Sequence, residues 1–254
     1  MNKIHLLDNG LINKIAAGEV VERPASVVKE LMENSIDAGA TSITVEIAEG
    51  GTSVIKITDN GKGIPKDEIR TAFMRHATSK IDSFEDLENV LTLGFRGEAL
   101  SSIASVAQVE MLTRTENDSM GTRIVINGGV VDREEECAAN VGTVFYVKNI
   151  FFNTPARRKF LKKPATEGSY ISEIVNRIAL GHPNIAIKYI NNGNIVLQTI
   201  GDGNVKNSLF YIYGKDIASK MLNLESEKEG YILKGLVGKP ELSRGNRNYE
   251  NFFI

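Results

Sequence analysis

Two hydrophobic periods divide the chain into helices and strands. From residue 24 to 38, opened by Pro24, apolar side chains recur three and four positions apart, which predicts an amphipathic helix. The runs 41–48 and 53–58 alternate apolar and polar residues instead, and the glycine-containing turn between them predicts an antiparallel hairpin. The first sixty residues therefore predict a helix followed by two paired strands.

The same two patterns continue to about residue 200. Alternation predicts further strands at 106–115, 121–127, 130–136, 142–148, 185–190 and 194–199. Helical spacing predicts helices at 66–74, 84–90, 97–105 and 166–180. Helices and antiparallel strands in this order predict an α+β sandwich, with helices covering one face of a mixed, mostly antiparallel sheet.

A domain boundary is expected at the small, polar stretch Gly201-Asp202-Gly203-Asn204, where the strand pattern gives way to a new helix. We expect a first domain over 1–203 and the start of a second, smaller α/β domain over 204–254. That second part is too short to form a convincing core, and 251–254 resemble the middle of a strand. The sequence is therefore expected to be a fragment of a longer protein.

Composition narrows the class of protein. The chain has 254 residues, 42% of them hydrophobic, and no run approaches the roughly 18 apolar residues of a membrane helix, so we expect a soluble, cytoplasmic protein. The single cysteine, Cys137, excludes an internal disulfide, and three scattered histidines form no zinc-binding spacing. A net charge of -2 gives no general attraction to nucleic acid, so any DNA contact needs a local basic patch or a partner subunit.

One face of the first predicted helix is acidic and carries an amide. At 100° per residue, Glu30, Glu33, Asn34 and Asp37 fall within an arc of about 100°, and Ser35 falls on the opposite, apolar side. A solvated surface stripe is the favoured interpretation of this helix alone. Against it, the pattern shows no lysine or arginine spaced at i+4 to relieve the repulsion, which a divalent cation would relieve. Asn34 offers a carbonyl oxygen suited to magnesium, and Glu30 is placed to accept a proton from a water.

A short glycine-containing motif follows the second predicted strand. Asp59-Asn60-Gly61-Lys62-Gly63 in isolation is typical of an ordinary turn. The functional alternative is a base pocket, because Gly61 and Gly63 let the backbone approach a flat ligand and the Asp59 carboxylate is able to accept a hydrogen bond from an exocyclic amine.

A second glycine motif comes just before a predicted helix. Gly94 and Gly97 stand at the start of the 97–105 run, and free amide groups at a helix N-terminus suit a phosphate. An ordinary glycine-punctuated helix start is an equally good interpretation of this motif alone. The chain contains no GxxxxGK followed by Ser or Thr, so it is not a P-loop ATPase.

Taken together, these stretches resemble a known family. KELMENSIDAGA at 29–40, DNGKGI at 59–64 and GFRGEAL at 94–100 resemble the split ATP site of the GHKL (Bergerat-type) superfamily. Four longer phrases narrow the resemblance to MutL-type DNA mismatch repair proteins: IAAGEVVERPASVVKEL at 15–31, RHATSK at 75–80, GFRGEALSSI at 94–103 and FFNTPARRKFLK at 151–162. The resemblance is strong from Ile15 to about Leu180.

The resemblance implies a magnesium-dependent ATPase with a role for each motif. It makes Glu30 the general base, Asn34 the magnesium ligand and Asp59 the adenine contact. The residues that it assigns to binding ATP are Asn34, Asp37, Asp59, Gly61, Gly63, Thr78, Ser79, Lys80, Gly94, Arg96, Gly97, Glu98, Ala99, Leu100 and Thr143. Among these, 78–80 belong to a lid over the nucleotide and 96–100 present amide groups to the phosphates.

The resemblance also implies how the protein works in the cell. ATP closes the lid and an N-terminal arm, residues 1–19, and pairs two ATPase halves into a homodimer that encircles DNA without regard to sequence. The clamp couples a mismatch-sensor protein to downstream repair factors on the nucleoid. In the family, a lysine of the second domain reaches the terminal phosphate, and its place lies beyond Ile254, so hydrolysis by this fragment is expected to be weak.

The dense basic cluster Arg157-Arg158-Lys159, with Lys162 and Lys163, follows two phenylalanines in a loop that leads into a short helix. DNA phosphate binding and a solvated helix face are equally good interpretations of this cluster.

Two alternatives to this function stay open. One is another GHKL ATPase, such as a topoisomerase module or a histidine kinase, although no helical hairpin with a phosphoacceptor histidine precedes the site. The other is a nucleotide-gated interaction module with negligible catalysis. The presence of Glu30 favours an enzyme.

Overall fold

The computed structural model describes residues 10, 17–78, 97–247 and 249–253. Its helices are α2 (Pro24–Asp37), α3 (Ile69–Ala72), α5 (Ala99–Val106), α6 (Pro155–Phe160), α7 (Pro164–Gly181), α8 (Val205–Tyr213) and α9 (Lys215–Ala218), with the short turns η1 (Glu49–Gly51) and η2 (Pro240–Leu242). Its strands are β1 (Ser42–Ala48), β2 (Val54–Asp59), β3 (Gln108–Arg114), β4 (Gly121–Asn127), β5 (Val130–Cys137), β6 (Gly142–Lys148), β7 (Ala186–Asn191), β8 (Asn194–Gln198), β9 (Met221–Lys228) and β10 (Tyr231–Gly238).

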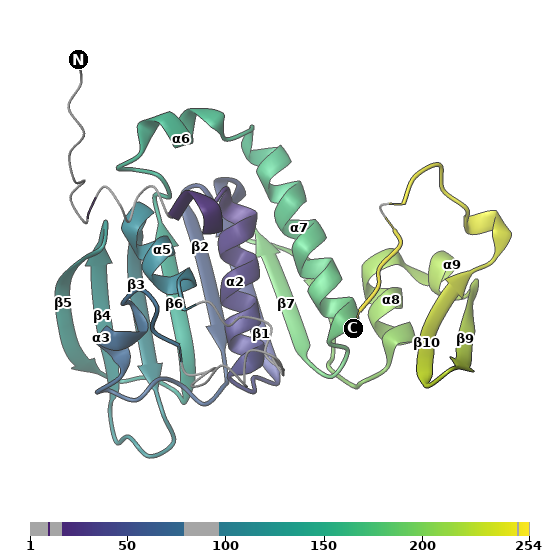
Figure 1. Ribbon diagram of the computed structural model, residues 1–254, viewed down its shortest axis with the longest axis horizontal. Helices are drawn as coiled ribbons and strands as arrows, with labels where there is room; N and C mark the ends of the chain where they lie inside the picture. Colours follow the sequence, from purple (N-terminus) through teal and green to yellow (C-terminus); the bar gives the residue numbers. More distant parts are fainter. Residues whose placement is uncertain (1–9, 11–16, 79–96, 248, 254) are drawn as a thin grey trace.

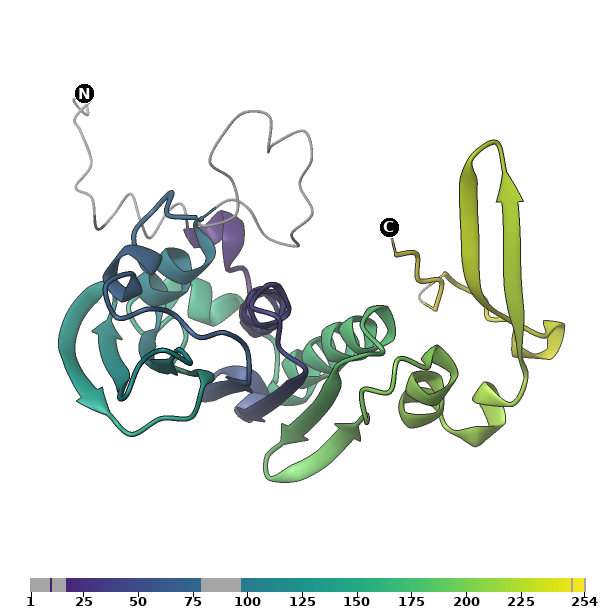
Figure 2. The same ribbon diagram turned by 90° about the horizontal axis from the view of Figure 1, so that it is seen from below.

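Eight of these strands form one sheet in the order β5-β4-β3-β6-β2-β1-β7-β8. Only β1 and β7 pair in parallel, and the other neighbours are antiparallel. The helices α2, α5 and α7 lie against one face of the sheet (Figures 1 and 2). The predicted α+β sandwich with a mixed, mostly antiparallel sheet is confirmed.

Alternating burial along the strands builds the core. In β1 and β2, every second residue is buried, and these side chains meet the buried face of α2. Leu31 and Met32 of α2 and Ile43, Ile55 and Ile57 of the strands are at most 1% exposed. Burying each such side chain contributes roughly 1.5–3 kcal/mol before entropic costs, so this interface fixes where α2 lies on the sheet.

Most predicted elements agree with the structure, with three main differences. The helix expected at 66–74 is only α3, because residues 66–68 form a turn before it. The strand expected at 251–254 is wrong: Asn251–Phe253 form no strand, and the Phe253 ring instead packs against Gly181 at the end of α7. The hairpin of β9 and β10 was not expected. The helix expected at 84–90 lies outside the described residues, as does most of the expected N-terminal arm.

The two edges of the sheet differ in character. At one edge, β5 carries Arg133-Glu134-Glu135-Glu136 and breaks register with β4 at Val125/Ile126. At the other edge, β8 exposes Ile195 and Val196, which are 58% and 52% exposed. Within the described part of the chain, no helix is long and apolar enough to cross a membrane.

Candidate nucleotide site

Asp59 lies where three elements meet at one end of the sheet. It ends β2, pairs with Thr143 at the start of β6, and contacts α2 through Ser35. Its Oδ1 accepts hydrogen bonds from the backbone N–H of Gly61 (2.9 Å) and of Thr143 (3.2 Å), and its Oδ2 accepts one from the Ser35 hydroxyl (2.9 Å). The residue is only 9% exposed, so the fold holds its carboxylate in a single orientation.

Burial and hydrogen bonding act against each other on this carboxylate. Burial raises the pKa of Asp59, because it penalises the charged form, while the bonds from Gly61, Ser35 and Thr143 lower it. Among the described residues, this buried carboxylate has three hydrogen-bond donors but no ion-pair partner, which is costly to maintain for stability alone. Buried carboxylates of this kind gather at functional sites more often than elsewhere, which makes Asp59 a candidate site residue.

The glycines after Asp59 are required by close packing. A Cβ at Gly61 would lie 2.9 Å from the Cβ of Ala38, at the end of α2. Gly63 has a φ of +72°, and a Cβ there would lie within 2.2 Å of the carbonyl oxygen of Arg114. The loop therefore runs tightly between α2 and the end of β3, where only glycine fits. This packing agrees both with an ordinary turn and with the wall of a base pocket.

The acidic face of α2 lies beside this cluster. Asn34 and Asp37 are partly exposed, and the Glu30 side chain is 25% exposed. We expected no lysine or arginine at i+4 to offset the repulsion among these carboxylates, and this expectation is wrong. Lys29 Nζ lies 2.9 Å from Glu33 Oε2, an i,i+4 pair, and 3.6 Å from Glu30 Oε1. Lys29 precedes Glu33 by one turn, so this pair is visible in the sequence. Repulsion on this face therefore gives no support to a cation site, which depends instead on the ligand chemistry of Asn34.

Two residues that the sequence did not indicate join the cluster. Ser35, assigned to the apolar side of the helix, donates to Asp59, and Thr113 on β3 connects to Thr143 with 3.2 Å between their hydroxyl oxygens. The Thr113 hydroxyl also donates to the carbonyl of Gly142 and accepts from the N–H of Ile64. A polar residue among apolar ones on a helix was the available signal for Ser35.

The two ends of the expected lid and phosphate region lie together. Ala77 packs against Gly97, whose Cβ position would be 2.6 Å from the Ala77 carbonyl oxygen. Arg75 and His76 each approach Glu98 Oε1 at 3.3 Å. The helix α5 begins at Ala99, so Ala99 and Leu100 lie in its first turn, where backbone N–H groups have no intrahelical partner. Thr78 is described, but Ser79, Lys80, Gly94 and Arg96 lie outside the described residues.

The basic cluster is not uniform. Arg158 and Lys159 on α6 are exposed, and so is Phe160, at 83%. Arg157 is half-buried, and its guanidinium lies against Gly18, whose Cβ position would be 2.2 Å from Nη2. Arg157 therefore joins α6 to the segment that precedes α2, while its two neighbours face outward.

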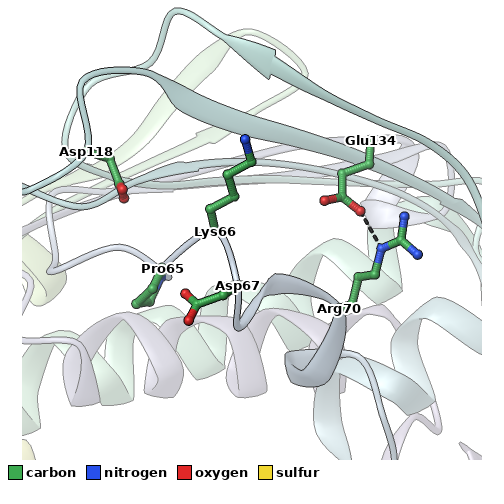
Figure 3. Close-up of a pocket in the computed structure, with 6 residues that line it drawn as sticks. All are labelled: Pro65, Lys66, Asp67, Arg70, Asp118 and Glu134. Atoms are coloured by element: carbon green, nitrogen blue, oxygen red, sulfur yellow. Dashed lines mark hydrogen bonds and ion pairs between the residues drawn. The ribbon is translucent and has the colours of Figure 1, made fainter.

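An open hollow of about 490 Å³ lies on another part of the molecule, between α3 and β5 (Figure 3). Its lining includes Arg70, whose Nε lies 2.6 Å from Glu134 Oε2, and Lys66, whose Nζ lies 2.8 Å from Glu136. These ion pairs occupy both of the cations that line it, Lys66 and Arg70. The hollow does not include Asp59 or the acidic face of α2.

Comparison with known proteins identifies the family. Residues 22–141 match the family described as histidine kinase-, DNA gyrase B-, and HSP90-like ATPases. A solved MutL ATPase domain from Aquifex aeolicus, complexed with ADP, is 30% identical, with a TM-score of 0.71, over 89% of this chain and 80% of that one. The chain belongs to the MutL family. MutL membership, predicted from the motifs, is confirmed.

Curated MutL relatives match the chain from end to end. The DNA mismatch repair protein MutL of Agathobacter rectalis is 57% identical and that of Caldanaerobacter subterraneus is 51% identical, each over 100% of this chain. The chain spans 39% and 43% of the length of those two relatives. It corresponds to the N-terminal ATPase region of a MutL protein.

Proposed function

We propose that this chain binds and hydrolyses magnesium-ATP at the end of the sheet where Asp59 lies. The observation that carries the proposal is the buried Asp59 carboxylate, fixed by three donors beside the acidic and amide face of α2. In this proposal Asp59 reads the adenine, while Gly61, Gly63 and Thr143 line the base pocket. The related Aquifex aeolicus domain, solved with ADP, supports a nucleotide as the ligand.

The face of α2 supplies the groups for hydrolysis. Glu30 accepts a proton from a water as that water's oxygen bonds to the terminal phosphorus and the bridging oxygen leaves with ADP. Asn34 would hold a magnesium ion through its side-chain carbonyl oxygen, and Asp37 would help to bind the nucleotide on the same face. Magnesium takes oxygen ligands, commonly one or two from protein with the rest from phosphates and water, so Asn34 fits it, and the ion would neutralise phosphate charge.

The phosphates lie, in this proposal, at the start of α5. The residues involved are Thr78, Ser79, Lys80, Gly94, Arg96, Gly97, Glu98, Ala99 and Leu100. The contact between Ala77 and Gly97 supports this assignment, because it brings the Thr78 segment to the N-terminus of α5.

For the whole protein, we propose a clamp that dimerises with ATP, holds DNA without sequence preference, and couples a mismatch sensor to repair factors in the cytoplasm. The exposed Arg158 and Lys159 support α6 as a contact for DNA phosphates. The proposed contact also contains Arg157, which is only partly exposed. We also propose a domain boundary near residue 203. The separate pairing of β9 with β10, and the Asn204 cap that starts α8, support it.

The experiment that tests the ATPase compares binding and turnover in three proteins: the parent chain, Glu30→Ala and Glu33→Ala. Removing a general base lowers turnover by about 100-fold to 10,000-fold, so Glu30→Ala is expected to lose magnesium-dependent phosphate release and to keep nucleotide affinity within about threefold. Glu33→Ala removes a carboxylate from the same face, one turn along, and is expected to keep most turnover.

Each other outcome has a distinct meaning. If the parent chain binds ATP tightly but releases no phosphate at any magnesium concentration, it is a nucleotide-gated interaction module. Equal turnover in Glu30→Ala and in the parent would remove Glu30 from the mechanism. A parent chain that binds no nucleotide would contradict the whole assignment.

A further inference from the structure

Ser35 has one hydroxyl hydrogen and two acceptors within reach. Its Oγ lies 3.0 Å from the carbonyl oxygen of Leu31, one turn earlier on α2, and 2.9 Å from Asp59 Oδ2. Ser35 is only 2% exposed. Bulk water therefore does not donate a hydrogen bond to the acceptor that the Ser35 hydroxyl leaves. The hydrogen therefore points to one acceptor at a time.

Of the two acceptors, the ionised Asp59 carboxylate is the stronger one for the Ser35 hydroxyl hydrogen. The Leu31 carbonyl lies inside α2, where the helical ladder already gives it the N–H of Ser35. Among the described residues, no other donor reaches Asp59 Oδ2, and hydrogen bonds to a charged group are stronger than neutral ones. With Asp59 ionised, the Ser35 hydroxyl donates to Oδ2.

Counting lone pairs then shows what the carboxylate has left. An ionised carboxylate has about four acceptor positions, two on each oxygen. On Oδ1, both are used by the N–H groups of Gly61 and Thr143. On Oδ2, Ser35 uses one, and a single acceptor position remains. The contacts from α2, from the loop after β2 and from β6 thus leave one place for a ligand donor.

We propose that Ser35 is a positioning residue for base selection: it holds Asp59 so that the remaining lone pair of Oδ2 accepts a hydrogen bond from an exocyclic amine. This inference rests on the proposed nucleotide site and names the atom that reads the base. A 6-amino purine places a donor at Oδ2. A 6-oxo purine places an oxygen there, and two facing acceptors repel each other, so the site rejects it.

The test compares ATP with inosine 5′-triphosphate, which differs at the 6-position, where it has a carbonyl oxygen and a protonated ring nitrogen. Competition binding gives the ratio of the two affinities for the parent chain, Ser35→Ala and Ser35→Cys. Alanine removes the donor, and cysteine keeps a side chain of similar size but is a weak donor. Both are expected to lower the preference for ATP by about tenfold or more, because Asp59 loses the contact that orients Oδ2.

The matched control is Ser172→Ala. Ser172 on α7 donates to the carbonyl of Gly168 at 3.0 Å, the same i,i−4 bond that Ser35 is able to make to Leu31, at a site away from Asp59. It removes the same atom from a helix and is expected to leave the ATP preference within about twofold of the parent. A general loss of helix packing would lower the binding of both nucleotides equally and would not change the ratio.

The outcomes separate this inference from the proposed function. A Ser35→Ala chain that keeps the parent's preference, while Asp59→Asn loses it, overturns the role of Ser35 and leaves the nucleotide site in place. A parent chain with no preference between the two nucleotides overturns the inference as well. If the parent and Asp59→Asn bind neither nucleotide, it is the proposed function that fails.

Discussion

Asp59 and the α6 segment present polar groups to prospective ligands in opposite ways. Asp59 is 9% exposed, and three donors from three parts of the chain fix its oxygens. On α6, by contrast, Arg158 and Lys159 are exposed and the neighbouring Phe160 is 83% exposed. One region restricts a single charge to one orientation, and the other displays several charges to solvent.

The difference determines what each region is able to recognise. A buried, oriented acceptor distinguishes ligands by one atom, because a wrong group leaves it unpaired in a medium of low dielectric constant. Exposed cations attract any nearby phosphate, weaken with salt and distinguish little. Base selection is therefore expected at Asp59 and sequence-independent nucleic-acid contact at α6.

The largest expected effect comes from removing the charge at Asp59. Asp59→Asn keeps the shape but lacks the carboxylate, and its amide nitrogen is a donor where the base amine also donates. We expect ATP affinity to fall about a hundredfold, measured by titration calorimetry. A change of less than threefold would mean that the buried carboxylate only stabilises the fold and that Asp59 does not select the base.

A smaller effect is expected at α6. Removing both exposed charges, with Arg158→Ala and Lys159→Ala together, is expected to weaken DNA binding about tenfold at low salt. If each contacts one phosphate, the slope of log affinity against log salt becomes shallower by about 2. Fluorescence anisotropy with duplexes of unrelated sequence measures both quantities, and the loss is expected to be the same for each duplex.

The matched control for that experiment removes the same two residue types elsewhere. Lys66→Ala with Arg70→Ala takes away cations that pair with Glu136 and Glu134 beside the hollow of Figure 3. This double variant is expected to leave the salt slope unchanged. Equal losses in the two double variants would show that only net charge matters and that α6 is not a distinct surface.

The smallest expected effect is on stability. Because burial raises the pKa of Asp59, the folded chain binds more protons than the unfolded chain at pH values between the usual carboxyl pKa and the raised one. The free energy of unfolding contributed by this group therefore falls as pH rises through that window. Asp59→Asn, which stays neutral, is expected to gain stability relative to the parent over the same range.

Thermal unfolding of both proteins from about pH 3 to about pH 8 measures this gain, because the window opens at the usual carboxyl pKa. We expect the variant's midpoint to rise relative to the parent by no more than about 3 °C, which corresponds to roughly 1 kcal/mol for a chain of this size. The asparagine nitrogen is able to donate to Ser35, whose hydrogen then turns to Leu31. A parent that gains stability over the variant with rising pH would show that the folded carboxylate favours its charged form.

Periodicity predicted the fold well because burial in the sheet alternates with strict period two. The strands at 121–127 and 142–148 agree with β4 and β6 residue for residue, since one face of each strand packs into the core. The β9 and β10 hairpin was missed because its residues are mostly exposed on both faces, so their pattern does not report burial.

The site was harder to predict, because its contacts join residues far apart in the chain. The helical wheel placed Glu30 and Asn34 on one face, but it also placed Ser35 with the apolar residues, and Ser35 contacts Asp59, 24 positions away. Thr113 and Thr143, 30 positions apart, meet only because β3 pairs with β6. The spacing of residues along one helix does not predict contacts between separate elements. The roles of the other site residues were predicted from the family resemblance.

The charged edge strand β5 affects how copies of this chain meet at high concentration. A free sheet edge offers unpaired backbone groups to any second strand, but Glu134, Glu135 and Glu136 would face like charges on a second copy, and the break in register with β4 bends the strand. The β8 edge also breaks register with its neighbour, at Tyr189/Ile190, but β8 carries no charged residue, and Ile195 and Val196 are exposed there. Strand addition between partly unfolded chains is therefore expected to begin at β8, where a single lysine in place of Val196 would improve solubility.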